Sequence, residues 1–185
     1  KTRKGPVTVD RDEQPTKSDP SKIPNLKPAF GKDGTITAAS AASISDGAAA
    51  LVMMRQSTAQ ALGLTPVARV VSQAAHAHEP HLFTTAPVPA VEKALAKAGK
   101  VDADIDWLIP HQANIRIMQG TAKKLKMDLN KLIVTVDEHG NTSAASVPLA
   151  AHRLLKEHPE LSGKPALQVG FGAGLVFAAQ VVILP

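Results

Sequence analysis

Residues 105–118 read IDWLIPHQANIRIM, and this stretch decides the fold class of the chain. Its first part, Ile105 to Ile109, is a short apolar run of the kind that forms a buried strand. The apolar residues that follow recur at three- and four-residue intervals, which predicts an amphipathic helix. They are Ile115, Met118, Ala122 and Leu125. A buried strand followed at once by a helix indicates a βα unit of a largely parallel sheet.

Strand and helix patterns alternate on both sides of this stretch. The expected strands cover residues 47–54, 68–73, 132–136, 166–169 and 176–184, and the expected helices cover 55–63, 89–99 and 147–157. Residues 74–89 contain three prolines and predict a loop. The last two strands are separated only by the glycine-rich turn 170–174, which makes them an antiparallel pair. The pattern predicts an α/β fold with a mixed sheet, an antiparallel edge strand and helices on its faces.

Composition separates an N-terminal arm from the rest of the chain. Residues 1–34 are rich in Lys, Asp, Pro and Gly, which predicts an extended, loop-dominated arm before one folded unit at 35–185. The chain has no cysteine, which excludes disulfides and thiolate zinc sites. No apolar run reaches the ~20 residues that a membrane span needs. No apolar segment follows the basic N-terminus, so we expect no signal peptide and a cytoplasmic protein.

The chain carries a net positive charge, and its basic residues are not clustered in the sequence. The formal net charge is +5 and the isoelectric point is about 9.6. Lys and Arg are scattered and aromatic residues make up only 3% of the chain, so we expect a solvated basic surface and no nucleic-acid partner. His76, His78 and His81 have spacings that suggest metal ligation. They fall in a predicted loop without an organised fourth ligand, and we expect no metal site.

Two sets of motifs resemble two families of one superfamily. Residues 12–99 resemble the biosynthetic thiolases, through segments 12–15, 26–30, 33–38, 45–50 and 84–90. Residues 102–185 resemble the C-terminal half of β-ketoacyl-acyl-carrier-protein synthase III, through segments 106–114, 139–146 and 170–174. The resemblance implies a thiolase-like fold of which the chain covers essentially the second half. It also implies a chimera that switches family near residues 99–102, either constructed or a natural recombinant.

The resemblance to synthase III assigns roles to individual residues. Residues matching His111 and Asn141 donate hydrogen bonds to the thioester oxygen of the second substrate in that family. By the same resemblance, Phe171 and the backbone amide near Ala173 border the acyl group. Asn114 then lies on the pantetheine side, and Arg116 and Lys123 lie on the helix face that docks an acidic carrier protein. The implied substrate is an acyl thioester of coenzyme A or of acyl-carrier protein, with no separate cofactor.

The chain lacks the cysteine nucleophile that both families use. Ser143 and Ser146 are candidate nucleophiles by residue type only, since neither lies in a Gly-x-Ser-x-Gly context. We therefore expect a half-site of an acyltransferase that is inactive alone. Its expected partner is a second copy of the chain or a missing N-terminal half. The alternative is a non-catalytic interaction module or engineered half-domain with the same fold.

Overall fold

The computed structural model describes residues 5–29, 31–77, 79, 87–172 and 176–184. Contacts divide the chain into two units, Lys1–Ala42 and Ser43–Pro185. The helices among the described residues of the first unit are a short helix, α1 (Gln14–Lys17), and the 3₁₀ helix η1 (Pro20–Asn25). Asp19 caps η1 by accepting a hydrogen bond from the Ser21 N–H at 3.1 Å. Nearly all described side chains of this unit are exposed.

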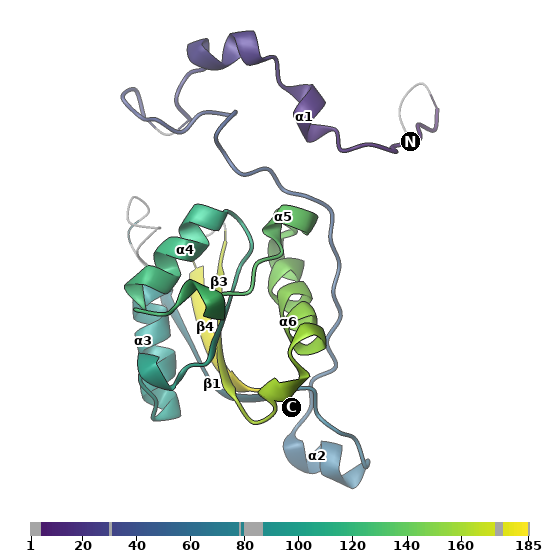
Figure 1. The fold of residues 1–185 in the computed structure, drawn as a ribbon, viewed down its shortest axis with the longest axis vertical. Helices are drawn as coiled ribbons and strands as arrows, with labels where there is room; N and C mark the ends of the chain where they lie inside the picture. Colours follow the sequence, from purple (N-terminus) through teal and green to yellow (C-terminus); the bar gives the residue numbers. More distant parts are fainter. Residues whose placement is uncertain (1–4, 30, 78, 80–86, 173–175, 185) are drawn as a thin grey trace. The chain divides into compact units, whose positions relative to one another are not determined.

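The second unit is built on a mixed sheet. Its strands within the described residues are β1 (Arg69–Ala77), β2 (Trp107–Pro110), β3 (Pro165–Phe171) and β4 (Val176–Ile183), in the order β1-β4-β3-β2 (Figure 1). β2 pairs with β3 in parallel, and β4 runs antiparallel to both of its neighbours. The mixed sheet and the antiparallel last pair are as the sequence predicts.

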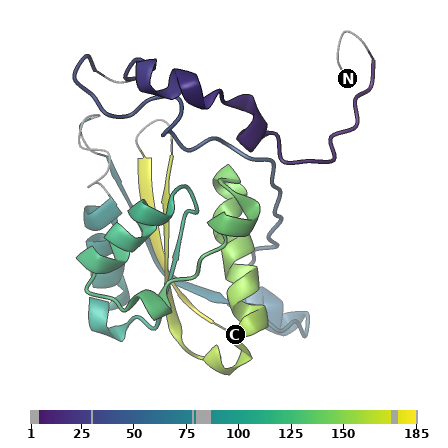
Figure 2. The ribbon, with the colours of Figure 1, turned by 45° about the horizontal axis from the view of Figure 1, so that its top comes forward.

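Helices cover the two faces of this sheet unequally. Helices α3 (Pro87–Ala98) and α4 (Ile115–Lys124) lie on one face, and α6 (Ser146–Glu157) lies on the other (Figures 1 and 2). Residues alternate along the strands, so neighbours in sequence contact different layers. Leu167 packs with the α3 and α4 side, and Ala166 packs with the α6 side.

The two long helices next to the sheet differ in how they are buried. Helix α3 buries one stripe, formed by Pro87, Ala90, Val91, Ala94 and Leu95. Helix α6 buries Ser146, Ala150 and Leu154, and leaves Val147, Leu149 and Leu155 only half-buried. Helix α6 therefore carries apolar side chains beside its buried residues that the described chain covers only in part.

The remaining elements are short. They are α2 (Gln56–Ala61), η3 (Asp102–Asp104), η4 (Leu129–Lys131), α5 (Val136–His139), η5 (Ser143–Ala145) and η6 (Pro159–Leu161). Gly63 follows α2 with φ of 64° and Gly99 follows α3 with the same value, the left-handed conformation that ends helices. No helix in the described parts of the chain is long and apolar enough to cross a membrane.

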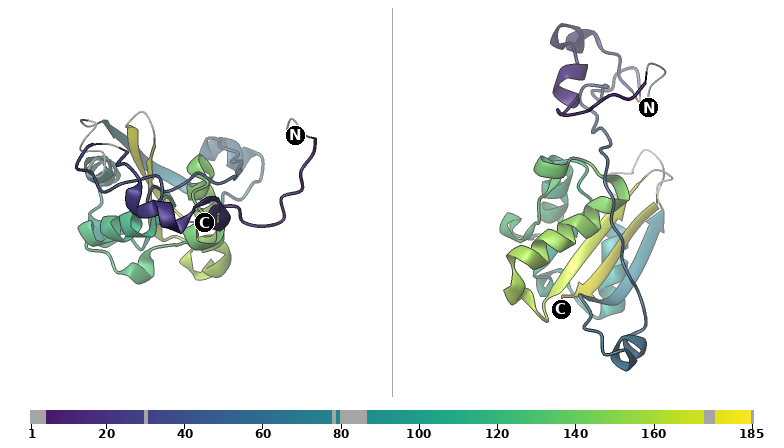
Figure 3. Two further views of the ribbon diagram at one scale, coloured as in Figure 1. Left: turned by 90° about the horizontal axis from the view of Figure 1, so that it is seen from above. Right: turned by 90° about the vertical axis from the view of Figure 1, so that its right-hand side faces the viewer.

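Three sequence-based assignments differ from the structure. Residues 47–54 form no strand, and the segment runs down the α6 side of the unit with Leu51 69% and Val52 89% exposed (Figure 3). Among the described residues, no strand pairs with 47–54. Residues 132–136 form a single parallel bridge, Leu108 to Leu132, before α5 begins. The predicted loop 74–89 is shortened, because β1 extends to Ala77 and α3 already begins at Pro87.

Candidate functional site

His111 is the first residue after β2, and its backbone continues the parallel ladder. Its N–H donates to the Val169 carbonyl at 2.7 Å. The ring is 9% exposed, and its Nδ1 lies 2.6 Å from Oγ of the buried Ser146, the first residue of α6. The other ring nitrogen, Nε2, has no partner among the residues that the structure describes. The strand end and the start of α6 therefore fix this imidazole and leave Nε2 available.

The surroundings of His111 are apolar on one side. Phe171, at the end of β3, meets the imidazole edge-on with ring centroids 4.9 Å apart and an interplanar angle of 74°. Burial lowers the pKa of His111 below its ordinary value, because a charged imidazolium loses hydration there. Burial therefore favours the neutral form of the ring. This contact brings together two of the residues that the sequence assigned to the site.

Asn141 is held in a turn that follows α5. Its side-chain Oδ1 accepts a hydrogen bond from the Ser143 N–H at 3.1 Å, and its carbonyl accepts one from the Ser45 N–H at 2.7 Å. Gly140 has φ of 65°, which favours glycine, and Ser143 also has a positive φ, of 52°. The amide nitrogen Nδ2 has no partner within the described ranges, so the N–H end of this side chain is its free end.

An ion-pair cluster holds the turn of Asn141 against α6. Arg153 of α6 contacts Glu138 of α5 at 3.0 Å and Glu157 one turn further along α6 at 2.8 Å. The Arg153 side chain is 30% exposed, so its contact with Glu138 orients α5 relative to α6 but adds little net stability.

A fully buried glutamine beside His111 was missed by sequence reasoning. Gln112 donates from Nε2 to the carbonyls of Pro110 and Ile133, at 2.9 and 3.2 Å, and accepts from the Thr135 N–H at 2.8 Å. This set of bonds links the end of β2 to the segment that leads into α5 and Asn141. It also occupies the Thr135 N–H, which explains why 132–136 continues no ladder. Nothing in the spacing of the sequence marks this glutamine as buried.

The thiolase-like segment touches the turn of Asn141 directly. A Cβ at Gly47 would lie 2.5 Å from Cβ of Thr142, which is 4% exposed, and a Cβ at Gly140 would lie 2.6 Å from Oγ of Ser45. Ile44 also forms an isolated parallel bridge with Asn141. Residues 44–47 therefore form a wall of this turn, and only glycine fits at positions 47 and 140.

We expect Gly47→Ala to destabilise the chain by about 1–3 kcal/mol, because the new methyl group overlaps the buried Thr142. Gly120→Ala is the matched control. Gly120 lies inside α4 with no atom near its virtual Cβ, and there alanine should stabilise by about 0.5–1 kcal/mol. Urea unfolding of both variants checks the opposite signs. Equal effects of the two substitutions on stability would contradict the close packing of residues 44–47 against the turn of Asn141.

Helix α4 holds the residues that the sequence assigned to pantetheine and carrier-protein contacts. Asn114 is the N-cap, and its side chain accepts a hydrogen bond from the Arg116 N–H at 2.9 Å. Arg116 in the first turn and Lys123 in the last are both exposed. Asn114 therefore has a structural role in starting the helix, whatever else it contacts.

Other predicted positions are less informative. Ala173 lies outside the described residues, as do His78 and His81. His76, on β1, has its Nδ1 3.1 Å from Nζ of Lys93. In the described ranges, no three His, Asp or Glu side chains gather closely enough to hold a metal ion.

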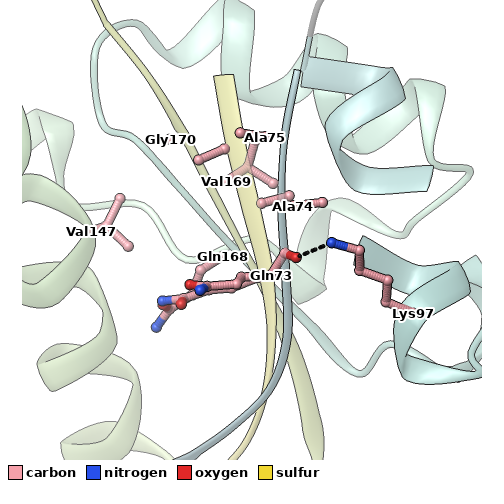
Figure 4. A pocket seen from close by; sticks show the side chains of 11 residues that line it. Gln73, Ala74, Ala75, Lys97, Val147, Gln168, Val169 and Gly170 are labelled. Atoms are coloured by element: carbon pink, nitrogen blue, oxygen red, sulfur yellow. Dashed lines mark hydrogen bonds between the residues drawn. The ribbon is translucent and has the colours of Figure 1, made fainter. Parts of the chain in front are cut away.

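An open pocket of about 550 Å³ lies beside the sheet (Figure 4). Gln73, Gln180 and Gln168 form a row across three adjacent strands, and Gln180 donates to Gln168. Val147 of α6 borders the pocket, and Lys97 donates to the Gln73 carbonyl at 3.1 Å. Its lining includes neither His111 nor Asn141. We interpret it as the part of the sheet that α6 leaves uncovered.

Two family models match the chain, in different places. The model for the C-terminal domain of 3-oxoacyl-[acyl-carrier-protein] synthase III matches residues 95–184, and the model for the N-terminal domain of thiolases matches residues 1–57. The first part of the chain is therefore similar to thiolases and the second part to synthase III. The sequence analysis assigned essentially the whole chain to the second half of the thiolase-like fold. The thiolase match refines this interpretation, because it is to the N-terminal domain. Residues 47–54 thus lie within the segment that matches the thiolase model.

Individual relatives agree with both matches. β-Ketoacyl-[acyl-carrier-protein] synthase III of Kocuria rhizophila is 59% identical over 95 residues, which are 51% of this chain and 27% of that protein. The Acat5 thiolase of Ascaris suum, solved with coenzyme A, has a TM-score of 0.69 at 29% identity over 96% of this chain and 47% of its own. Synthase III of Aquifex aeolicus has a TM-score of 0.55 at 28% identity, covering 64% and 45%.

The fold is therefore thiolase-like, as predicted, and the sequence is similar to thiolases over residues 1–57 and to synthase III over residues 95–184. The chain spans about a quarter of the length of the Kocuria relative and just under half of each of these solved chains.

Proposed function

We propose that this chain supplies the His/Asn half-site of an acyltransferase that condenses acyl thioesters. One observation carries the proposal. His111 is held through Nδ1 at Ser146 and Asn141 through Oδ1 at Ser143, and the second nitrogen of each side chain, Nε2 and Nδ2, has no partner among the described residues. Two neutral N–H donors suit an oxygen that gains negative charge during a reaction.

The proposed chemistry is decarboxylative condensation. The bond between the α-carbon and the carboxylate of a malonyl thioester breaks, carbon dioxide leaves, and the electron pair forms an enolate with its charge on the thioester oxygen. His111 and Asn141 donate to that oxygen. The α-carbon then attacks the carbonyl of an acyl-cysteine, and the cysteine thiolate leaves. A donor of this kind lowers such a barrier by about 3–4 kcal/mol. This stabilisation requires that the N–H groups of both side chains lie ~3 Å from the same ligand oxygen.

Helix α4 suggests where the thioester arm approaches. Arg116 and Lys123 lie on the exposed surface of α4, and the helix begins only four residues after His111. Exposed cations attract an acidic carrier protein or the phosphates of coenzyme A. We therefore propose acyl-coenzyme A or acyl-carrier protein as the substrate carrier, with Asn114 near the pantetheine, Phe171 beside the acyl group and Ala173 in the turn that borders it. No separate cofactor is part of the proposal.

Because the chain contains no cysteine, we expect no acyl-enzyme to form on it alone. Incubation with radiolabelled acetyl-coenzyme A should leave the purified chain unlabelled. Mixing it with the separately expressed, cysteine-bearing first half of a β-ketoacyl synthase III should restore release of coenzyme A from acetyl- and malonyl-coenzyme A. The first half alone is the control. Stoichiometric labelling of the chain alone would contradict the proposal. A folded complex without turnover would favour the alternative, a non-catalytic interaction module.

We also expect the isolated chain to associate with itself. Three features leave apolar surface open in the second unit: the half-buried apolar residues of α6, the small residues of the sheet that line the open pocket, and the apolar segment 51–54. Open patches of this kind favour association. Light scattering at micromolar concentration should give a dimer or larger species, and added first half should replace the second copy. A monodisperse monomer would contradict this expectation.

A further inference from the structure

Ser146 is a buried hydroxyl that the proposed chemistry does not use. It is 1% exposed and begins α6, and its Oγ has two neighbours, the Nδ1 of His111 at 2.6 Å and the Gln112 N–H at 3.2 Å. Among the described residues, no third partner contacts this hydroxyl. A buried serine without a partner for its proton would lose a hydrogen bond, so the direction of these two contacts can be worked out.

The Gln112 N–H can only donate, so Ser146 Oγ accepts there. The hydroxyl proton then needs an acceptor, and the nearest is Nδ1 of His111. If Nδ1 carried a proton instead, Oγ would accept twice and its own proton would be buried without a partner. The lower-energy arrangement places the proton of the neutral imidazole on Nε2, the nitrogen that has no partner among the described residues.

We propose that Ser146 is the positioning residue of His111. It orients the imidazole from the start of α6, and by donating to Nδ1 it holds the ring as the Nε2–H donor. The Gln112 backbone in turn fixes the serine, so the strand end that carries His111 also orients its support. The catalytic part of this inference rests on the proposed function, but the hydrogen bond itself is independent of it.

The hydrogen bond is tested on the intact chain by nitrogen-15 spectroscopy of the imidazole rings at neutral pH. The signals of His111 are assigned by their loss in His111→Ala. We expect the Nδ1 signal in the range of an unprotonated ring nitrogen. Because this nitrogen accepts a hydrogen bond, its resonance should lie upfield of that of an unprotonated nitrogen without a partner. Ser146→Ala should move it downfield to the position of a free acceptor. Ser57→Ala, an exposed serine of α2, should change nothing at His111.

A protonated Nδ1 in the wild-type chain would overturn the proposal, as would an unchanged Nδ1 signal in folded Ser146→Ala. Because a buried substitution can prevent folding, Ser146→Thr is the second variant. It keeps the hydroxyl and should keep the upfield signal, and its loss in a folded Thr variant would also count against the proposal.

The positioning role is tested in the reconstituted enzyme. Ser146→Ala should lower kcat about tenfold with KM unchanged, since one orienting hydrogen bond is lost without loss of substrate contacts. Full activity of Ser146→Ala alongside the altered Nδ1 signal would overturn the positioning role. Absence of activity in the wild-type mixture would instead count against the proposed function, and the nitrogen spectrum would still decide the contact.

Discussion

Replacing His111 by alanine is expected to lower the rate of the reconstituted enzyme by about 10²–10³-fold, because one of two donors to the enolate oxygen is removed. The readout is carbon dioxide release from malonyl-coenzyme A, a step that needs the donors but not the acyl-cysteine. The loss should fall on kcat, since the interaction forms mainly as charge develops on the oxygen. Burial keeps the imidazole neutral, so this donor role does not depend on a protonated ring.

His152→Ala is the matched control for this prediction. His152 is exposed on α6, and its removal should leave the rate unchanged. Asn141→Ala should cause a loss of similar size, and the double variant should lose less than the product of the two because both donors act on one oxygen. A rate within threefold of the wild type for a folded His111→Ala variant would refute the donor role.

The elements that the sequence predicted well are those with strong local signals. Helix α4 has apolar residues at helical intervals and an N-cap at Asn114, and α3 ends at a glycine that takes a positive φ. The final strand pair follows from the short glycine-rich turn between the strands. In these cases, local patterning and tertiary packing favour the same structure, and the sequence alone is sufficient.

The misassigned segments depend on partners that no local pattern shows. Residues 47–54 have the apolar composition of a buried strand, yet Val52 is 89% exposed because the described chain offers no strand beside it. Residues 132–136 have strand-like composition, but Gln112 takes the Thr135 N–H that a neighbouring strand would use. A strand forms only where another strand can pair with its backbone, and the local sequence pattern does not show whether that neighbour is present.

The candidate site was predictable only in part for the same reason. His111 and Asn141 stand in recognisable motifs, and the structure shows how each is held. Their supports do not stand out in sequence. Ser146 attracts notice only as a hydroxyl, and Gln112 only as a polar residue beside a histidine. Their roles depend on burial and on partners that lie 21 to 35 positions away.

Gln112→Leu is expected to destabilise the chain by about 3–4 kcal/mol. Leucine has a similar volume, so the change tests the hydrogen bonds and creates little cavity. It removes three bonds and leaves the Thr135 N–H and the Ile133 carbonyl buried without partners, and each such group costs about 1–3 kcal/mol. The loss should be visible as a lower urea midpoint with an unchanged slope.

Gln119→Leu, on the exposed side of α4, is the matched control and should stay within about 0.5 kcal/mol of the wild type. All variants must be compared at one protein concentration, because self-association contributes to apparent stability. A loss below 1 kcal/mol for Gln112→Leu would mean that water or a backbone shift satisfies the freed groups. The side chain would then fill space beside His111 without linking β2 to the segment that leads to Asn141. With the predicted loss, Gln112 is the residue that couples the two halves of the candidate site, because its three bonds join the backbone at His111 to the backbone before α5.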